Sequence, residues 1–172
     1  MFRLLKADEI DVRVATINEK GASLLLYKDA RCDMNILDET VGAFNWKREH
    51  TRENANCIVS LWDETKKEWV SKEDTGTESF SEKEKGLASD SFKRACFNWG
   101  IGRELYTAPF IYVSADKMKI YEKNGKHATY DKFSVEKIVY DENRQISGIA
   151  IKNQKGERVF VYNNTKKENK KV

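Results

Sequence analysis

The chain has 172 residues, 34% of them charged, yet its formal net charge at pH 7 is only +3. This length suits one domain with an appendage and is enough for a hydrophobic core. So small a charge excess excludes a uniformly basic nucleic-acid-binding protein, and any basic surface must come from segregation of the charges.

Three cysteines, Cys32, Cys57 and Cys96, make an odd number without a CxxC pair. Cys57 and Cys96 fall in apolar patterns, which favours buried free thiols and a reducing compartment. The first residues lack the apolar core and cleavage site of a signal peptide, and no run approaches the roughly 20 apolar residues of a membrane span. We therefore expect a cytoplasmic protein that does not enter a membrane.

Two strands and a helix are predicted first. Residues Ile10 to Ile17 alternate between apolar and polar, and Ser23 to Lys28 form a second, more apolar strand after a turn at Gly21. Residues Asp29 to Val41 have helical periodicity, and Gly42 is expected to end that helix.

A β-meander followed by a long helix is predicted next. Alternating or apolar runs at 44–52, 57–62 and 69–77 indicate three sequential strands joined by short turns. Ser81 and Glu84 then form a capping box, and Gly100 provides the end of the helix. One apolar stripe runs along this helix, formed by Leu87, Ala88, Phe92, Ala95, Cys96 and Trp99.

The pattern changes after Pro109. A short apolar run at 111–113 and a polar connection from Lys117 to Lys132 precede three alternating stretches at 134–140, 146–152 and 158–162. The sequence therefore predicts an α+β fold in three parts. Residues 1–109 form an antiparallel β-β-β-α core, residues 110–162 an appended C-terminal β-meander, and residues 163–172 a disordered basic tail.

No enzyme signature is present. The chain lacks GxSxG and HExxH motifs, and His50 and His127 stand alone in polar surroundings. A group of acidic residues could in principle hold magnesium for a nuclease, but the same residues suit the start of a helix. They are Glu73, Asp74, Glu78, Glu82 and Glu84. We expect no catalytic residue, no metal and no cofactor.

Several cations occur beside aromatic residues. Lys93 and Arg94 lie on the predicted long helix, Lys47 and Arg48 on a predicted strand beside Trp46, and Arg103 just after the helix. A positive groove with rings nearby is what a protein needs to hold single-stranded nucleic acid without reading its sequence. The alternative is that these are ordinary surface charges and that the tryptophans belong to the core.

The helix segment ASDSFKRACFNWG resembles the KRA(x)3(F/W)G helix of the Rad-fifty-two family of single-strand-annealing proteins, and more closely the Sak-type annealing proteins of bacteriophages. LDETVGAFNW is similar to the segment in which that family ends its first conserved helix and enters its β-meander. Two further strands and the turn DTGTES fill the interval between these blocks. The resemblance covers roughly residues 23 to 108.

The resemblance implies a β-β-β-α core that assembles into rings or filaments and anneals complementary strands without ATP in phage-type recombination and repair. Lys93 and Arg94 match the family's lysine–arginine pair in the DNA groove, and Tyr27 matches a groove tyrosine. Lys47, Arg48 and Arg103 are added on charge grounds alone. A further basic residue of the family, three places after the arginine, is missing here, where Phe97 stands.

The expected partners are single-stranded DNA, further copies of the chain in a ring or filament, and a single-strand-binding protein or exonuclease in the cytoplasm of a bacterial host. Three alternatives stay open. They are a protein that coats single-stranded DNA or RNA without annealing it, a metal-dependent nuclease using Glu73, Asp74 and Glu78, and a phage interaction protein that blocks a host target.

Overall fold

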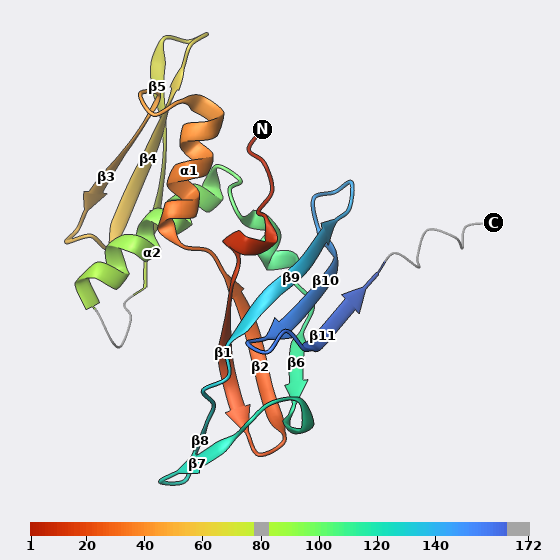
Figure 1. Ribbon diagram of the computed structural model, residues 1–172. Coiled ribbons are helices and arrows are strands. Elements are labelled where there is room, and N and C mark those ends of the chain that lie inside the picture. The colour runs from red at the N-terminus through yellow and green to blue at the C-terminus, as the bar shows by residue number, and fades with distance from the viewer. Residues whose placement is uncertain (78–82, 165–172) are drawn as a thin grey trace. The chain divides into compact units, whose positions relative to one another are not determined.

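The computed structural model describes residues 1–77 and 83–164, and among these residues it has two α-helices and eleven strands (Figure 1). Every strand pair is antiparallel, which confirms a mixed α+β fold. The chain divides into two compact units. Unit 1 comprises Met1–Leu4 and Lys28–Arg103, and unit 2 comprises Leu5–Tyr27 and the described residues from Glu104 onward.

Unit 1 contains a three-stranded sheet in the order β3-β4-β5, against which α2 packs. The side chains of Val59 on β4 and of Phe92, Ala95 and Cys96 on α2 are completely buried, so the predicted apolar stripe faces this sheet. The elements of the unit are α1 (Ala30–Val41), β3 (Trp46–Thr51), β4 (Asn56–Asp63), β5 (Glu68–Thr75) and α2 (Lys83–Asn98). The predicted meander and the helix that follows it are confirmed.

Helix α1 begins and ends as its sequence predicts. The Oδ1 atom of Asp29 accepts a hydrogen bond from the backbone N–H of Cys32 at 2.9 Å, which satisfies a free amide of the first turn. Gly42 follows the helix with φ of 85°, a conformation that glycine adopts without strain. The indole of Trp46 on β3 donates to Asp38 at 2.6 Å and stacks on Phe92 with ring centroids 6.1 Å apart, so one side chain joins both helices to the sheet.

Unit 2 is built on a six-stranded antiparallel sheet with strand order β11-β10-β9-β1-β2-β6. The strands are β1 (Asp11–Asn18), β2 (Gly21–Tyr27), β6 (Ile111–Ser114), β9 (Phe133–Tyr140), β10 (Ile146–Asn153) and β11 (Arg158–Asn163). The outermost strands β6 and β11 contact each other, so the sheet curls round its own core. Ala22, Val113, Ile149 and Ile151 are among the side chains buried there.

This topology differs from the division that we expected at Pro109. The C-terminal strands are present where the sequence predicts them, but they are no appendage, because β9 pairs with β1 and β6 pairs with β2. The first two strands therefore belong to unit 2, and the β-β-β-α core consists of the stretch between them and Glu104. Periodicity identified the strands but carries no information about which distant strand pairs with which.

The polar connection expected at Lys117–Lys132 also differs, because it contains a hairpin of β7 (Tyr121–Lys123) and β8 (Lys126–Ala128). Short 3-10 helices occur at Ala7–Glu9, Arg103–Thr107 and Ala115–Lys117. The three cysteines are buried free thiols, as predicted. Two expectations lie outside the described residues, namely the capping box that begins at Ser81 and the basic tail from residue 165 onward.

Candidate nucleic-acid interface

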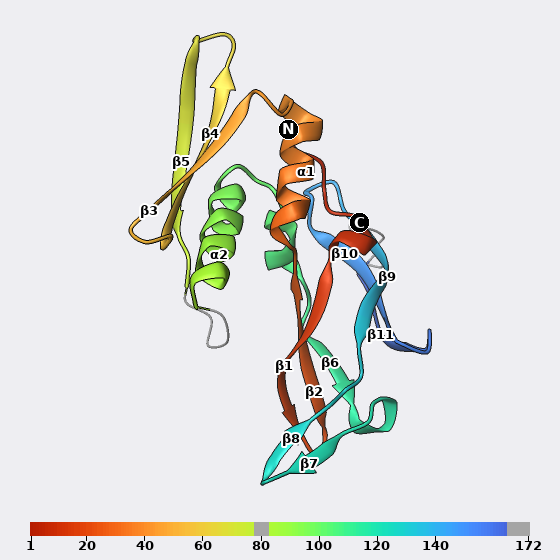
Figure 2. The ribbon, with the colours of Figure 1, turned by 60° about the vertical axis from the view of Figure 1, so that its left-hand side comes forward.

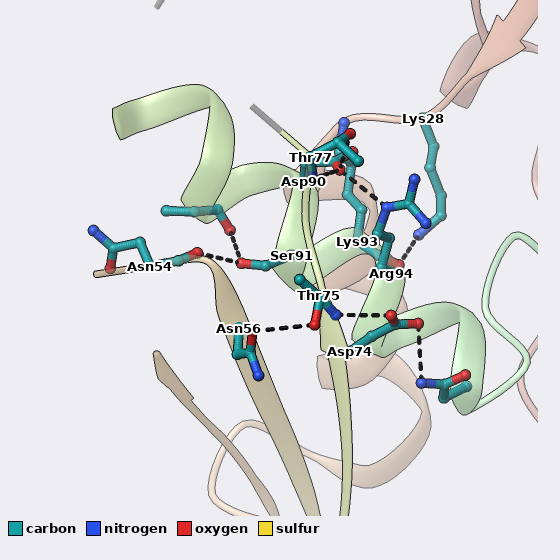
Figure 3. Close-up of polar contacts among 12 residues, drawn as sticks. Lys28, Asn54, Asn56, Asp74, Thr75, Thr77, Asp90, Ser91, Lys93 and Arg94 are labelled. Atoms are coloured by element: carbon teal, nitrogen blue, oxygen red, sulfur yellow. Dashed lines mark hydrogen bonds and ion pairs between the residues drawn. The ribbon is translucent and has the colours of Figure 1, made fainter. Parts of the chain in front are cut away.

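Lys93 and Arg94 lie side by side in the second half of α2, and both are half-buried. The Nε atom of Arg94 donates to Asp90 Oδ2 at 3.0 Å, one helical turn earlier (Figure 3). The same carboxylate accepts hydrogen bonds from the backbone N–H of Thr77 at 2.9 Å and from its hydroxyl at 3.2 Å. Asp90 thus fixes the direction of the Arg94 guanidinium. Thr77, which follows strand β5, holds the Asp90 carboxylate in turn.

Burial acts to raise the pKa of Asp90, but the hydrogen bonds from Thr77 and the guanidinium of Arg94 outweigh it, so its pKa lies below the usual value. Asp90 is therefore ionised at neutral pH. The amine of Lys93 makes no hydrogen bond and no ion pair within residues 1–77 and 83–164, whereas the guanidinium of Arg94 is paired with Asp90.

Beneath these cations Lys28 and Asp33 form an ion pair that is removed from solvent, with 2% and 0% of the two residues exposed. The Nζ atom of Lys28 also lies 3.5 Å from the backbone oxygen of Lys93 (Figure 3). It is 4.4 Å from the centre of the Phe97 ring. The stem of Lys28 crosses Gly102, where an added Cβ would lie 2.4 Å from Lys28 Cε. Lys28 thereby connects the start of α1 to the end of α2.

Lys47 and Arg48 point to opposite faces of the β3-β4-β5 sheet, because successive strand residues alternate. Arg48 faces α2, with its guanidinium carbon 4.8 Å from the centre of the Phe92 ring. Lys47 lies on the other face, where its amine is 4.6 Å from the ring of Trp69, itself in edge contact with Trp62. Both cations are candidates on charge grounds, but they lie on opposite faces of the sheet and cannot contact one strand of DNA side by side.

The side chain of Arg103 makes hydrogen bonds to the backbone at the end of α2. Its Nε donates to the backbone oxygen of Phe97 at 2.9 Å and its terminal nitrogen to that of Asn98 at 3.0 Å. These carbonyls belong to the last turn of α2 and have no donor four residues further along. Phe97 O also accepts from the backbone N–H of Gly100 at 2.9 Å, and Asn98 O from Lys72 Nζ. Arg103 thus caps the C-terminus of α2, where a positive charge also suits the helix dipole.

We expect Arg103→Ala to lower the free energy of unfolding by about 1 kcal/mol, because two carbonyl groups each lose one of two donors and the end of α2 loses a positive charge. Urea unfolding followed by circular dichroism measures this, with Arg103→Lys as the control that keeps the charge but not the forked geometry. Unchanged stability together with weaker binding of single-stranded DNA would instead assign Arg103 to the DNA surface.

Tyr27 lies at the end of β2 in unit 2, with 38% of its surface exposed. The guanidinium of Arg13, from the neighbouring strand β1, stands 5.2 Å from its ring centre. The ring is therefore placed as an accessible face beside a cation within unit 2. The other five predicted site residues belong to unit 1.

The sequence reasoning missed Lys72 on β5, whose amine lies 4.6 Å from the ring centre of Trp99 and donates to the backbone oxygen of Asn98 at 2.8 Å. With it, the described residues contain five contacts between a cation and an aromatic ring, and about two would be typical of a chain this long. Four of the five lie in unit 1. Alternation on β5 could have shown that Lys72 faces the helix together with Val70.

Other features give less support to a site. A groove of about 580 Å³ in unit 2 lies where β1 and β9 pair through only two residues, but three basic and three acidic side chains line it. In the part of the chain that the structure describes, no group of three or more His, Cys, Asp or Glu is arranged to hold a metal ion. Asp74 accepts a hydrogen bond from Asn98 at 3.2 Å, while Glu78, Glu82 and the side chain of Glu84 lie outside the described residues.

No described helix has both the length and the apolar character needed to cross a lipid bilayer. Comparison of the chain with protein-family models, with curated proteins and with solved structures gives no match. The interpretation of the site therefore depends on the chemistry of its residues and on the motif resemblance of α2.

Proposed function

We propose that unit 1 binds single-stranded DNA through Lys93 and Arg94 and promotes the pairing of complementary strands without ATP, as the resemblance of α2 to annealing proteins implies. One observation carries the proposal. Two adjacent cations lie on a helix that is anchored to a sheet by completely buried side chains, and the amine of Lys93 has no acceptor among the described residues. Fixed cations of this kind suit phosphates that arrive from outside.

The mechanism needs no bond to be made or broken. Neutralised phosphates allow two strands to approach each other, and a strand held by its backbone keeps its bases available for pairing. The protein acts as a template in this scheme, and recombination and repair by strand annealing is the process it would serve.

Assembly into a ring or filament is part of the proposal. Strands β3 and β5 form the two edges of the sheet in unit 1, so within the described residues each has one side without a neighbouring strand. Such edges pair readily with other chains. Several copies would extend one row of cations along a strand. A single-strand-binding protein or an exonuclease would be the protein partner in such a pathway.

An annealing assay with two complementary labelled oligonucleotides tests the proposal. Without ATP, the wild type should accelerate duplex formation, and Lys93→Ala with Arg94→Ala should remove the acceleration. The charge-matched control is Lys6→Ala with Lys137→Ala, which changes two exposed lysines of unit 2. Binding without acceleration by the wild type would indicate a coating protein, and absence of binding would overturn the proposal.

A further inference from the structure

Among the described residues, no strand pair joins the β7–β8 hairpin to the six-stranded sheet of unit 2. The strands of the hairpin form a separate two-stranded sheet (Figure 2). The strand register places Lys123 directly opposite Lys126. The two turn residues, Asn124 and Gly125, have φ of 53° and 72°. Asn-Gly with two positive φ values is the preferred turn for so tight a hairpin. The local sequence thus specifies this hairpin, although two-stranded sheets of this size are only marginally stable by themselves.

The charges on the hairpin oppose its own stability. Lys123 and Lys126 face each other across the two strands, and like charges in that position repel. Neither amine forms a hydrogen bond or ion pair within the part of the chain that the structure describes. The segment 117–132 contains five lysines and only two acidic residues, one of which, Asp131, accepts hydrogen bonds from the backbone of Lys119 and from Gln154.

Aromatic rings stand beside these lysines. Tyr121 is 47% exposed and Tyr130 is 82% exposed, and their ring centroids are 5.5 Å apart. Tyr121 shares a face of the hairpin with Lys123 because side chains two residues apart in a strand point the same way. Lys126 is on this face too, as the direct partner of Lys123. One surface therefore carries two cations without counter-charges and two accessible rings.

We propose that this face of the β7–β8 hairpin is a binding site for single-stranded nucleic acid, with Lys123 and Lys126 on phosphates and Tyr121 and Tyr130 under the bases. The ligand class follows from the presence of two facing lysines beside two exposed tyrosine rings. A polyanion relieves the repulsion between the lysines, and exposed rings beside them match the stacking faces that bases require. The inference rests on the proposed function, to which it adds a second contact in the region that the motif resemblance does not cover.

The test compares binding of a short oligothymidylate and of inorganic polyphosphate, a polyanion without bases, by fluorescence anisotropy and competition over a range of salt. Lys123→Ala with Lys126→Ala should weaken oligothymidylate binding about 10- to 30-fold near 0.1 M salt and flatten the log–log salt slope by about 1.4, since two phosphate contacts are lost. Lys6→Ala with Lys137→Ala is the charge-matched control and should leave the affinity close to that of the wild type.

Tyr121→Leu with Tyr130→Leu should weaken oligothymidylate binding at least about 5-fold and leave polyphosphate binding unchanged, while Tyr121→Phe with Tyr130→Phe keeps the rings and the affinity. Equal loss of both ligands in the lysine variant, with no effect in the leucine variant, would show a general polyanion site and overturn the inference. Circular dichroism confirms that each variant keeps its fold.

The unit 1 variant, Lys93→Ala with Arg94→Ala, separates this inference from the proposed function. If only that variant loses affinity, the hairpin is no binding site and the proposed function stands. If only the hairpin variants lose affinity, the hairpin is confirmed and the site on α2 is wrong. A wild type that binds no oligothymidylate at any salt concentration overturns both.

Discussion

Lys28→Met should lower the free energy of unfolding by about 3–5 kcal/mol between pH 7 and 8, because it leaves the Asp33 carboxylate buried without its cation. Folded domains are stable by only about 5–15 kcal/mol, so this is a large fraction of the total. The carboxylate has little else to compensate it. Its Oδ2 atom is buried and has no hydrogen-bond partner among the described residues.

The loss should shrink as the pH falls. Burial raises the pKa of Asp33 to about 6, even though the charge and hydrogen bond of Lys28 act to lower it. The folded pKa lies above the unfolded value of 3.8, so this carboxyl stabilises the fold fully below 3.8, and the contribution is lost as the pH rises through about 6. Without Lys28 the pKa of Asp33 rises further. Wild type and variant should therefore converge in urea unfolding below about pH 5, where both carboxyls are protonated.

Two controls make this prediction specific. Lys28→Met with Asp33→Leu removes both charges and should be as stable as the wild type or more so, with less dependence on pH, because well-packed apolar side chains replace an expensive buried pair. Lys67→Met breaks the exposed pair with Glu64 and should change stability little, since water screens that pair. A Lys28→Met protein as stable as wild type at pH 8 would contradict the account.

Lys93→Ala with Arg94→Ala should weaken single-stranded DNA binding about 10- to 30-fold near 0.1 M salt and reduce the log–log salt slope by about 1.4, the effect of two lost phosphate contacts on a single strand. The loss should be nearly the same for all DNA sequences, because phosphates carry no sequence information. Anisotropy titrations with oligonucleotides of different composition measure both effects.

The unfolding free energy of this variant should change little, because neither side chain lies in the completely buried stripe of α2. Asp90→Asn is the matched comparison. It removes the carboxylate that fixes Arg94 and also one negative charge near the site, so it should keep or increase affinity. An intact fold with unchanged DNA affinity in Lys93→Ala with Arg94→Ala would exclude these residues as the binding site.

Local signals in the sequence were sufficient for the elements. Asp29 and Gly42 mark the ends of α1, and the spacing of Phe92, Ala95 and Cys96 identifies the buried face of α2. The turn Asn124-Gly125 is an equally local signal, and it could have located the β7–β8 hairpin within the segment taken as a connection.

Non-local facts could not be predicted in this way. The pairing of β1 with β9 joins residues far apart in the chain, and neither sequence pattern names the other strand. The cap formed by Arg103 and the burial of Lys28 beside Asp33 depend on how the chain turns at Gly102. Charge alone suggested a DNA contact for Arg103, but its guanidinium already donates hydrogen bonds to two backbone carbonyl groups.

The interleaved order of the two units has a consequence for the nascent chain. Strands β1 and β2 emerge from the ribosome first, but their partners β9 and β6 are synthesised only after Arg103. Nearly all of unit 1 is one continuous stretch, so it can fold before the rest of unit 2 is synthesised. Until then the β1–β2 hairpin leaves Ala22 and Leu24, which are buried in the complete fold, exposed to solvent. An unfinished sheet of this kind is a binding target for chaperones during translation. A protein truncated after Pro109 would keep that sheet unfinished permanently and should aggregate.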